Sequence, residues 1–217
     1  QLLSAYINHS IRTDNESIWI AQAEGRAKDG DDRTDSAILK MFHMSRKGEA
    51  FAEVIGSLRL TPVSISYEYD PCDQAKAREL FIRASSGSYS KAAGEDDQSI
   101  ALGITGYKGR VHVHFGSVVS QGLEDSKQLA AEMDRQILSG YRLFPVHYLA
   151  YAMWAERDPE LNVPDAAQLF SAAELAAAQA EWHKRLSNCP SEQQPFLILQ
   201  YANPVRNQYR IKAGLPL

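Results

Sequence analysis

The chain has 217 residues and a formal net charge of −4 at pH 7, and 44% of its residues are hydrophobic. This length and hydrophobic content fit one domain with a sizeable core, or one domain with a helical extension. The acidic balance gives no argument for nucleic-acid binding, no apolar run is long enough to cross a bilayer, and two cysteines make no disulfide framework, which favours a reduced, cytoplasmic setting.

Helices and strands alternate in the predicted first half of the chain. Apolar residues at helical spacing indicate helices, and short apolar or alternating runs indicate strands. The run Ser17–Gln22 is apolar without alternation, which is typical of a strand buried on both faces. Asp35 or Ser36 is placed to cap the next helix. The helices are predicted at 2–12, 36–44, 48–58 and 71–81, and the strands at 17–22 and 60–69.

The second half is predicted to be mainly helical, with a mobile loop at 85–94 and one strand at 110–115. Its helices are predicted at 96–107, 124–138, 147–156, 165–187 and 191–210, the last one interrupted at Asn203-Pro204.

This order of elements predicts an α/β fold, a mixed and partly parallel sheet flanked by helices, with a C-terminal helical annex. We expect Ile18–Ala21, Val63–Tyr67 and Val111–Phe115 to lie in that sheet. Residues 1–140 then form the α/β domain, and residues 141–217 form the helical extension.

Glu24-Gly25-Arg26 follows the first predicted strand directly. Glycine permits a sharp turn, and the carboxyl ends of strands are where open α/β sheets place their ligands. The planar fork of Arg26 suits two oxygens of a phosphate, whereas the alternative role for Arg26 is a structural ion pair. Lys28 can add positive charge against the same phosphate, or it can belong to a solvated loop.

The segment Ala21-Gln-Ala-Glu-Gly-Arg-Ala-Lys-Asp-Gly30, the strand in Leu60–Tyr69 and the strand Val111–Phe115 followed by Gly116 resemble the glycerolipid acyltransferase family. The likeness is to a bacterial subgroup described as 1-acylglycerol-3-phosphate acyltransferases. It implies an enzyme of phospholipid biosynthesis that moves an acyl chain from acyl-CoA or acyl-carrier protein to a phosphorylated glycerol or lysolipid. It implies no cofactor and no metal, and a cytoplasmic location or a peripheral one on the inner face of the cell membrane.

The family's catalytic motif, His-x-x-x-x-Asp, is expected far upstream of Glu24. His9 and Asp14 match it literally, but they lie at the end of an amphipathic helix with no strand before it, so we interpret the match as a decoy. Because the chain begins with Gln1, we expect a fragment that lacks the catalytic motif and is inactive alone. The substrate-binding residues expected within the chain are Glu24, Gly25, Arg26 and Lys28.

Two other groupings have a functional and a structural interpretation. His112 and His114 lie two apart on a predicted strand and could share a metal, but no third ligand has suitable spacing, so a solvated strand face is favoured. The aspartates between 29 and 35 offer oxygen ligands for calcium, but their spacing does not fit an EF-hand, so a polar loop is favoured.

The competing function is a non-catalytic module that binds a phosphate, a lipid headgroup or a partner protein. A third possibility is acyl transfer to another acceptor, such as an ornithine lipid. The acyl donor, the acceptor and the oligomeric state stay open.

Overall fold

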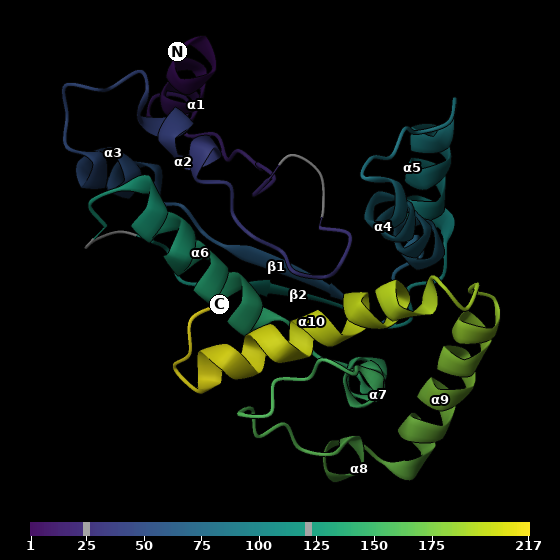
Figure 1. The fold of residues 1–217 in the computed structure, drawn as a ribbon. Helices are drawn as coiled ribbons and strands as arrows, with labels where there is room; N and C mark the ends of the chain where they lie inside the picture. The colour runs from purple at the N-terminus through teal and green to yellow at the C-terminus, as the bar shows by residue number, and fades with distance from the viewer. Residues whose placement is uncertain (24–26, 120–122) are drawn as a thin grey trace. The chain divides into compact units, whose positions relative to one another are not determined.

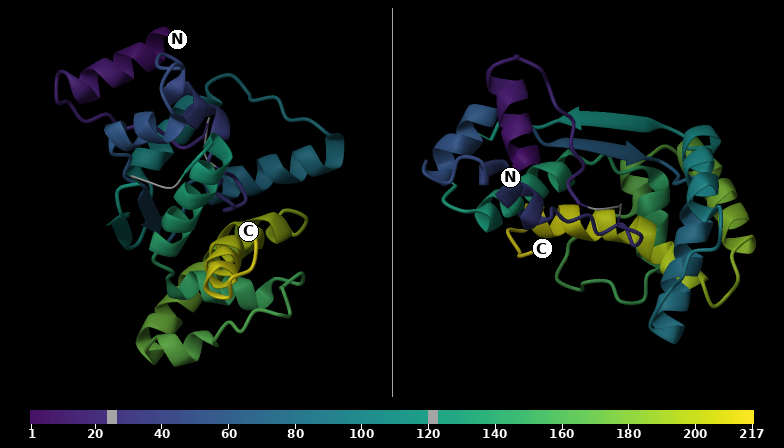
Figure 2. Two further views of the ribbon diagram at one scale, coloured as in Figure 1. Left: turned by 90° about the vertical axis from the view of Figure 1, so that its left-hand side faces the viewer. Right: turned by 90° about the horizontal axis from the view of Figure 1, so that it is seen from above.

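The computed structural model describes residues 1–23, 27–119 and 123–217. In this part of the chain the backbone is mostly helical, and its one sheet has two strands (Figure 1). These strands, β1 (Val63–Tyr67) and β2 (Val111–Phe115), are antiparallel, as their opposed arrows in Figure 2 show. The predicted α/β fold with a mixed, partly parallel sheet flanked by helices is therefore wrong.

The predicted strand over Ile18–Ala21 does not form. These residues have no regular secondary structure, and the side chain of Trp19 is 68% exposed. A strand needs a neighbour for its backbone groups, and β1 and β2 pair with each other. Just beyond the apolar run, the Asp35 amide donates a hydrogen bond to the Gln22 carbonyl oxygen at 2.8 Å. Without a ladder partner, the apolar run stays irregular.

The chain divides into two compact units, each built from three separate segments. Unit 1 contains Gln1–Arg26, Asp32–Ser64 and Val113–Gly140. Unit 2 contains Ala27–Asp31, Ile65–His112 and Tyr141–Leu217. The division falls within both strands of the sheet, and the helices that follow residue 140 belong to the same unit as the chain between 65 and 112.

In the described part of unit 1, four helices surround one apolar cluster. Asp35 caps α2 by accepting a hydrogen bond from the Ala37 amide at 2.8 Å, which confirms the predicted cap. The core is formed mainly by Ile7, Leu39, Phe42, Leu58 and Leu129. The helices are α1 (Leu2–Arg12), α2 (Ser36–His43), α3 (Phe51–Leu58) and α6 (Ser126–Gly140).

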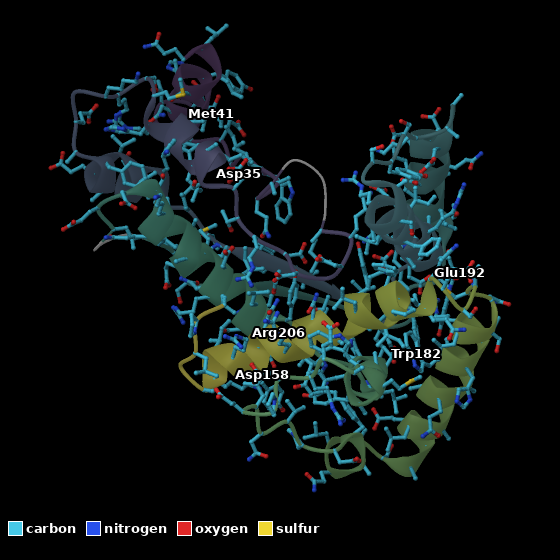
Figure 3. All side chains as sticks on the ribbon, viewed as in Figure 1. Asp35, Met41, Asp158, Trp182, Glu192 and Arg206 are labelled. Atoms are coloured by element: carbon cyan, nitrogen blue, oxygen red, sulfur yellow. The ribbon has the colours of Figure 1, made fainter. Side chains whose placement is uncertain are left out.

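Unit 2 contains the other helices of the described chain, and α10 packs against both α7 and α4. Its core includes Trp182, which is labelled in Figure 3 and is 2% exposed. The helices are α4 (Asp73–Ser86), α5 (Glu95–Thr105), α7 (Pro145–Met153), α8 (Ala166–Leu169), α9 (Ala172–Ser187) and α10 (Gln194–Lys212). No helix among the described residues is long and apolar enough to span a bilayer.

Two predictions about the continuity of helices in unit 2 are wrong. The helix expected over 165–187 is split into α8 and α9, because Ser171 and Glu174 form a capping box that starts a new helix. The interruption expected at Asn203-Pro204 is absent, since α10 continues through Pro204. A proline inside a helix leaves the carbonyl four residues earlier without its usual donor. Here that carbonyl belongs to Gln200.

Candidate functional site

The motif residues Glu24, Gly25 and Arg26 lie outside the described residues. The chain is described again from Ala27, and the segment Ala27–Asp31 belongs to unit 2. This segment is called the motif loop below, because it follows the motif in the chain. It begins directly after Arg26, and α4 and α10 hold it in place.

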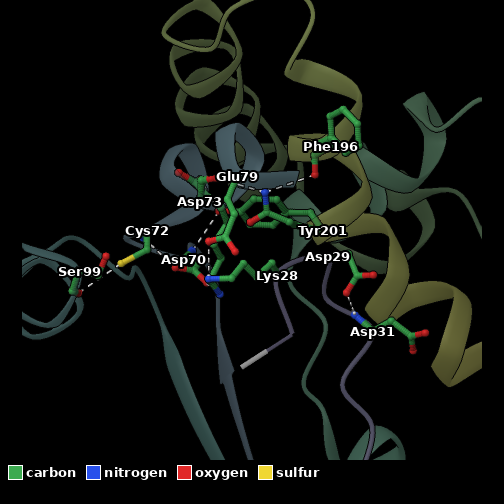
Figure 4. A network of polar contacts seen from close by, with 12 residues as sticks. Lys28, Asp29, Asp31, Asp70, Cys72, Asp73, Glu79, Ser99, Phe196 and Tyr201 are labelled. Carbon is green, nitrogen blue, oxygen red and sulfur yellow. Dashed lines mark hydrogen bonds and ion pairs between the residues drawn. The ribbon is translucent and has the colours of Figure 1, made fainter. Parts of the chain in front are cut away.

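Lys28 is held by a buried carboxylate on α4. Its Nζ lies 2.7 Å from Glu79 Oε2, and the Glu79 side chain is only 4% exposed (Figure 4). Arg83 approaches the other carboxylate oxygen at 2.7 Å, as an ion pair without hydrogen-bond geometry, and more than half of its side chain is in solvent. A nearly buried carboxylate needs a cation beside it. Lys28, predicted as a phosphate ligand, is therefore engaged with Glu79 in this structure.

Two asparagines on α10 anchor the rest of the motif loop. Asn203 Nδ2 donates to the Asp29 carbonyl oxygen at 2.9 Å, and Asn207 Nδ2 donates to Asp31 Oδ1 at 2.7 Å. Both asparagines are buried. The Asp31 amide donates in turn to Asp29 Oδ1 at 3.1 Å, which closes a local turn (Figure 4). Two of the aspartates considered for calcium therefore already accept hydrogen bonds from the protein.

Gly30 lies against the backbone of α10, where a side chain does not fit. Its φ is +76°, and a Cβ added to it would lie 2.2 Å from the Gln200 carbonyl oxygen and 3.2 Å from Pro204 Cδ. Pro204 has no amide hydrogen for that carbonyl, so the helix leaves this oxygen open to the loop. Glycine is required here both for the backbone angle and for the space.

A buried polar network joins α4, α9 and α10. Asp73 accepts a hydrogen bond from the Tyr201 hydroxyl at 2.7 Å and pairs with Arg185 at 2.5 Å. Gln200 Nε2 donates to the Asp73 carbonyl oxygen at 3.1 Å. Burial raises the pKa of Asp73 and that of Tyr201. The network fixes the two helices that carry Glu79 and the asparagines.

A cavity of about 450 Å³ adjoins the motif loop within unit 2. Arg206 lies over the Trp154 ring at 6.0 Å, and Arg210 pairs with Asp158 at 2.5 Å. Asp158 and Arg206 are labelled in Figure 3. The lining carries charges of both signs and includes Asp29, Asp31, Trp154, Asp158, Asn203 and Arg206. The cavity therefore suits a polar group better than an acyl chain.

The structure brings His9 and Asp14 together in unit 1. His9 Nε2 lies 3.5 Å from Asp14 Oδ1, and the two side chains are 64% and 47% exposed. This distance is longer than a good hydrogen bond, and solvent surrounds both groups. The interpretation of this match as a decoy therefore stays a prediction.

Among the residues that the structure describes, no group of three or more His, Cys, Asp and Glu side chains is arranged to hold a metal ion. His114, one of the two histidines considered as ligands, packs its ring close to the backbone of Gly140.

Comparison of the chain with protein-family models, with curated proteins and with solved structures found no match.

The sequence did not reveal the groups that hold the motif loop, which are Glu79, Asn203, Asn207 and the Gln200 carbonyl against which Gly30 packs. The two residues of each polar contact are 51 to 176 positions apart in the chain, so local spacing does not reveal these contacts. One signal was available: Pro204 within a helical run marks a carbonyl that lacks a helical donor. In the sequence, Pro204 predicted an interruption of the helix. In the structure the helix continues, and the open Gln200 carbonyl lets Gly30 pack closely against α10.

Proposed function

We propose that this chain supplies the phosphate-binding segment of an acyltransferase in phospholipid biosynthesis, with Glu24, Gly25 and Arg26 at the acceptor phosphate. The motif resemblance suggests the reaction. The observation that supports it is the seating of the motif loop, because a solvated loop needs neither a buried partner for its lysine nor a glycine pressed against a helix carbonyl. A segment held on α4 and α10 offers a preorganised base for ligand binding.

The proposal does not rest on the predicted sheet edge, since the strand before the motif is absent. It rests on the motif and on the loop that follows it. With a lysolipid as acceptor, the enzyme works in the cytoplasm at the inner face of the cell membrane, where that acceptor is found.

The proposed reaction is attack of an acceptor hydroxyl on an acyl thioester. The hydroxyl oxygen bonds to the carbonyl carbon, the carbon–sulfur bond breaks, and the thiolate of CoA or acyl-carrier protein leaves. The hydroxyl proton passes to a base, for which the resemblance implies a histidine oriented by an aspartate. Arg26 contributes by holding the phosphate through two parallel hydrogen bonds, which positions the hydroxyl.

The first test is calorimetric binding of sn-glycerol 3-phosphate, with glycerol as the ligand that lacks the phosphate. We expect binding of the phosphate ester only. Arg26→Ala should weaken it by about 2–4 kcal/mol, which is roughly 30- to 1000-fold in Kd, because a charge-assisted bidentate contact is lost. Arg26→Lys should recover part of the affinity, since it keeps the charge without the fork. Arg12→Ala, an exposed arginine on α1, is the control.

Unchanged binding in Arg26→Ala together with a lower unfolding temperature would make Arg26 a structural ion pair and would refute the phosphate role. The competing function, a non-catalytic module, predicts the same binding without turnover. An acyl-transfer assay on the complete gene product, with acyl-CoA and lysophosphatidic acid, separates the two functions.

A further inference from the structure

The cavity beside the motif loop is built entirely from unit 2. Its lining comes from α10, from the chain that follows α7 and from the motif loop itself. Its volume of about 450 Å³ lies in the range of pockets that hold a small molecule. Two of its carboxylates already have partners, because Asp158 pairs with Arg210 and Asp31 accepts a hydrogen bond from Asn207. The remaining polar groups determine what the cavity can bind.

Two half-buried side chains on this lining carry opposite charges without an ion pair. The Arg206 guanidinium lies 6.0 Å from the centre of the Trp154 ring, but it pairs with no carboxylate among the described residues. Asp29 accepts a hydrogen bond from the Asp31 amide, but it pairs with no cation in the described chain. A charge that is partly withdrawn from water gains from a partner of opposite sign. A ligand that carries both charges satisfies both groups.

A buried hydroxyl at the Arg206 end of the cavity also lacks a partner. Tyr151 on α7 is 6% exposed, and its hydroxyl accepts from and donates to no described residue. Its ring meets the ring of Trp154 edge to face at 6.2 Å, and Arg206 contacts that same ring. Burial raises the pKa of Tyr151, and the charge of Asp158 raises it as well. Arg157 and Arg206 act in the opposite direction, so the charges around the hydroxyl are those of the lining. Buried hydroxyls are normally hydrogen-bonded, so this one points to a bound group.

We propose that the cavity binds a small zwitterion, with its carboxylate at Arg206 and the Tyr151 hydroxyl and its ammonium at Asp29. An arginine and a tyrosine hydroxyl both donate, so the group between them is an acceptor. An ionised aspartate only accepts, so the group beside it is a donor. The lining holds four carboxylates and two arginines, and this surplus of negative charge disfavours a dianion such as a phosphate monoester. Binding of the zwitterion does not depend on the proposed acyl transfer.

Calorimetric titration of the full chain with ω-amino acids tests the ligand class. The probes are glycine, 4-aminobutyrate and 6-aminohexanoate, because the span between Arg206 and Asp29 selects the length. We expect one of them to bind with a Kd of about 1 mM or below. The acid and the amine of the same chain length (butyrate and butylamine for 4-aminobutyrate) should bind at least about tenfold more weakly, since each lacks one charge-assisted contact. Failure of all three probes, or equal binding of the acid or the amine, would overturn the proposal.

Substitution of Arg206 tests the carboxylate contact. Arg206→Gln should raise Kd for the best probe by about 10- to 100-fold, because the charge that faces the carboxylate is lost. Arg206→Lys should recover part of the affinity, since it keeps the charge without the planar fork. Lys212→Met is the matched control: it removes a cation from the same helix outside the lining, and it should leave Kd within about twofold. Equal losses in Arg206→Gln and Lys212→Met would make the effect one of overall charge and would refute the contact.

Tyr151→Phe separates a ligand contact from a structural role. Because the hydroxyl has no partner among the described residues, its removal should not lower Tm, whereas Kd for the best probe should rise by about five- to tenfold. A lower Tm with an unchanged Kd would show that the hydroxyl supports the fold, and it would overturn the assignment of Tyr151 to the ligand.

Asp29→Asn tests the orientation of the ligand. Asparagine keeps an acceptor for the Asp31 amide, so the turn of the motif loop should persist. The variant should bind the best amino acid about tenfold more weakly and the matched acid more tightly, because it no longer attracts an ammonium or repels a lone carboxylate. Weaker binding of both ligands, or unchanged binding of the amino acid, would refute the contact between Asp29 and the ammonium.

Discussion

Substitution of Gly30 by alanine is expected to destabilise unit 2 more than a surface loop change normally would. An L-residue at φ +76° costs about 1–2 kcal/mol. The new Cβ would lie 2.2 Å from the Gln200 carbonyl oxygen, where ordinary contact requires about 3.5 Å, so the loop must move by about 1 Å. That shift breaks the 2.9 Å hydrogen bond from Asn203 to Asp29, which leaves a buried amide without an acceptor, at about 1–3 kcal/mol.

The expected loss is therefore about 3 kcal/mol, or roughly 6–12 °C in Tm for a chain of this size. Urea unfolding followed by tryptophan fluorescence measures it. Gly87→Ala is the matched control, because Gly87 has φ +78° but no atom within 4 Å of its added Cβ, so only the backbone cost of about 1–2 kcal/mol applies. Asparagine tolerates this angle, so Gly87→Asn should be nearly neutral while Gly30→Asn stays costly. Equal losses at the two glycines would refute the seating of Gly30 on α10.

Three further predictions concern the histidines and the buried network. Burial lowers the pKa of His147 to about 4, below its unfolded value near 6.5, so the free energy of unfolding should fall as pH drops from about 6.5 to 4. His147→Asn keeps an acceptor for the Phe144 amide and should reduce this pH dependence, as measured by urea unfolding at several pH values. An unchanged pH dependence in this variant would contradict the assignment to His147. Tyr201→Phe removes the hydroxyl between Asp73 and the Asp70 amide and should lower the free energy of unfolding in urea by about 1–3 kcal/mol. Tyr209→Phe is the control and should lower it by less than half as much, because its hydroxyl contact with Tyr148 is 3.3 Å long. Equal losses in the two variants would show that the network does not hold the helices. His9→Ala should leave the free energy of binding of sn-glycerol 3-phosphate and the free energy of unfolding within about 0.5 kcal/mol, because the pair with Asp14 is exposed. Loss of acyl transfer in this variant would show that the motif match is functional.

Local patterns in the sequence predicted most helices and the pairing of Val63–Tyr67 with Val111–Phe115 in one sheet, but they wrongly added a third strand and a partly parallel arrangement. The helix over Leu2–Arg12 and the cap at Asp35 depend on residues a few positions apart, and both are confirmed. A strand depends on a partner elsewhere in the chain, so the apolar run at Ile18–Ala21 looks the same whether or not a neighbour exists. The break at Ser171 is a local signal that was missed, because a long alanine-rich run favours one continuous helix.

The alternation over β1 shows the same limit for side chains. Val63, Ile65 and Tyr67 alternate with Ser64 and Ser66, and it is the serines that are buried. The Ser66 hydroxyl accepts a hydrogen bond from the Arg142 amide at 2.9 Å, a partner 76 residues away. Period-two spacing predicts a strand, but only tertiary contacts decide which face is covered.

The candidate site could be predicted only in part for the same reason. Glu24-Gly25-Arg26 is visible as a contiguous motif, whereas Glu79 carries no mark in the sequence that connects it to Lys28. The contact comes from the packing of α4, which a pattern of nearby residues does not encode.

The contacts of Asn203 and Asn207 also have a consequence for the order of events during synthesis. Asp29 and Asn203 are 174 positions apart. At about 5–20 residues per second, a ribosome needs roughly 9–35 s to make the chain between them. Throughout that interval the Gln200 carbonyl against which Gly30 packs is absent, and Asp29 and Asp31 lack their asparagine donors. The nascent motif loop therefore lacks its contacts with α10 over that interval, and it reaches the conformation described above only when α10 folds onto it.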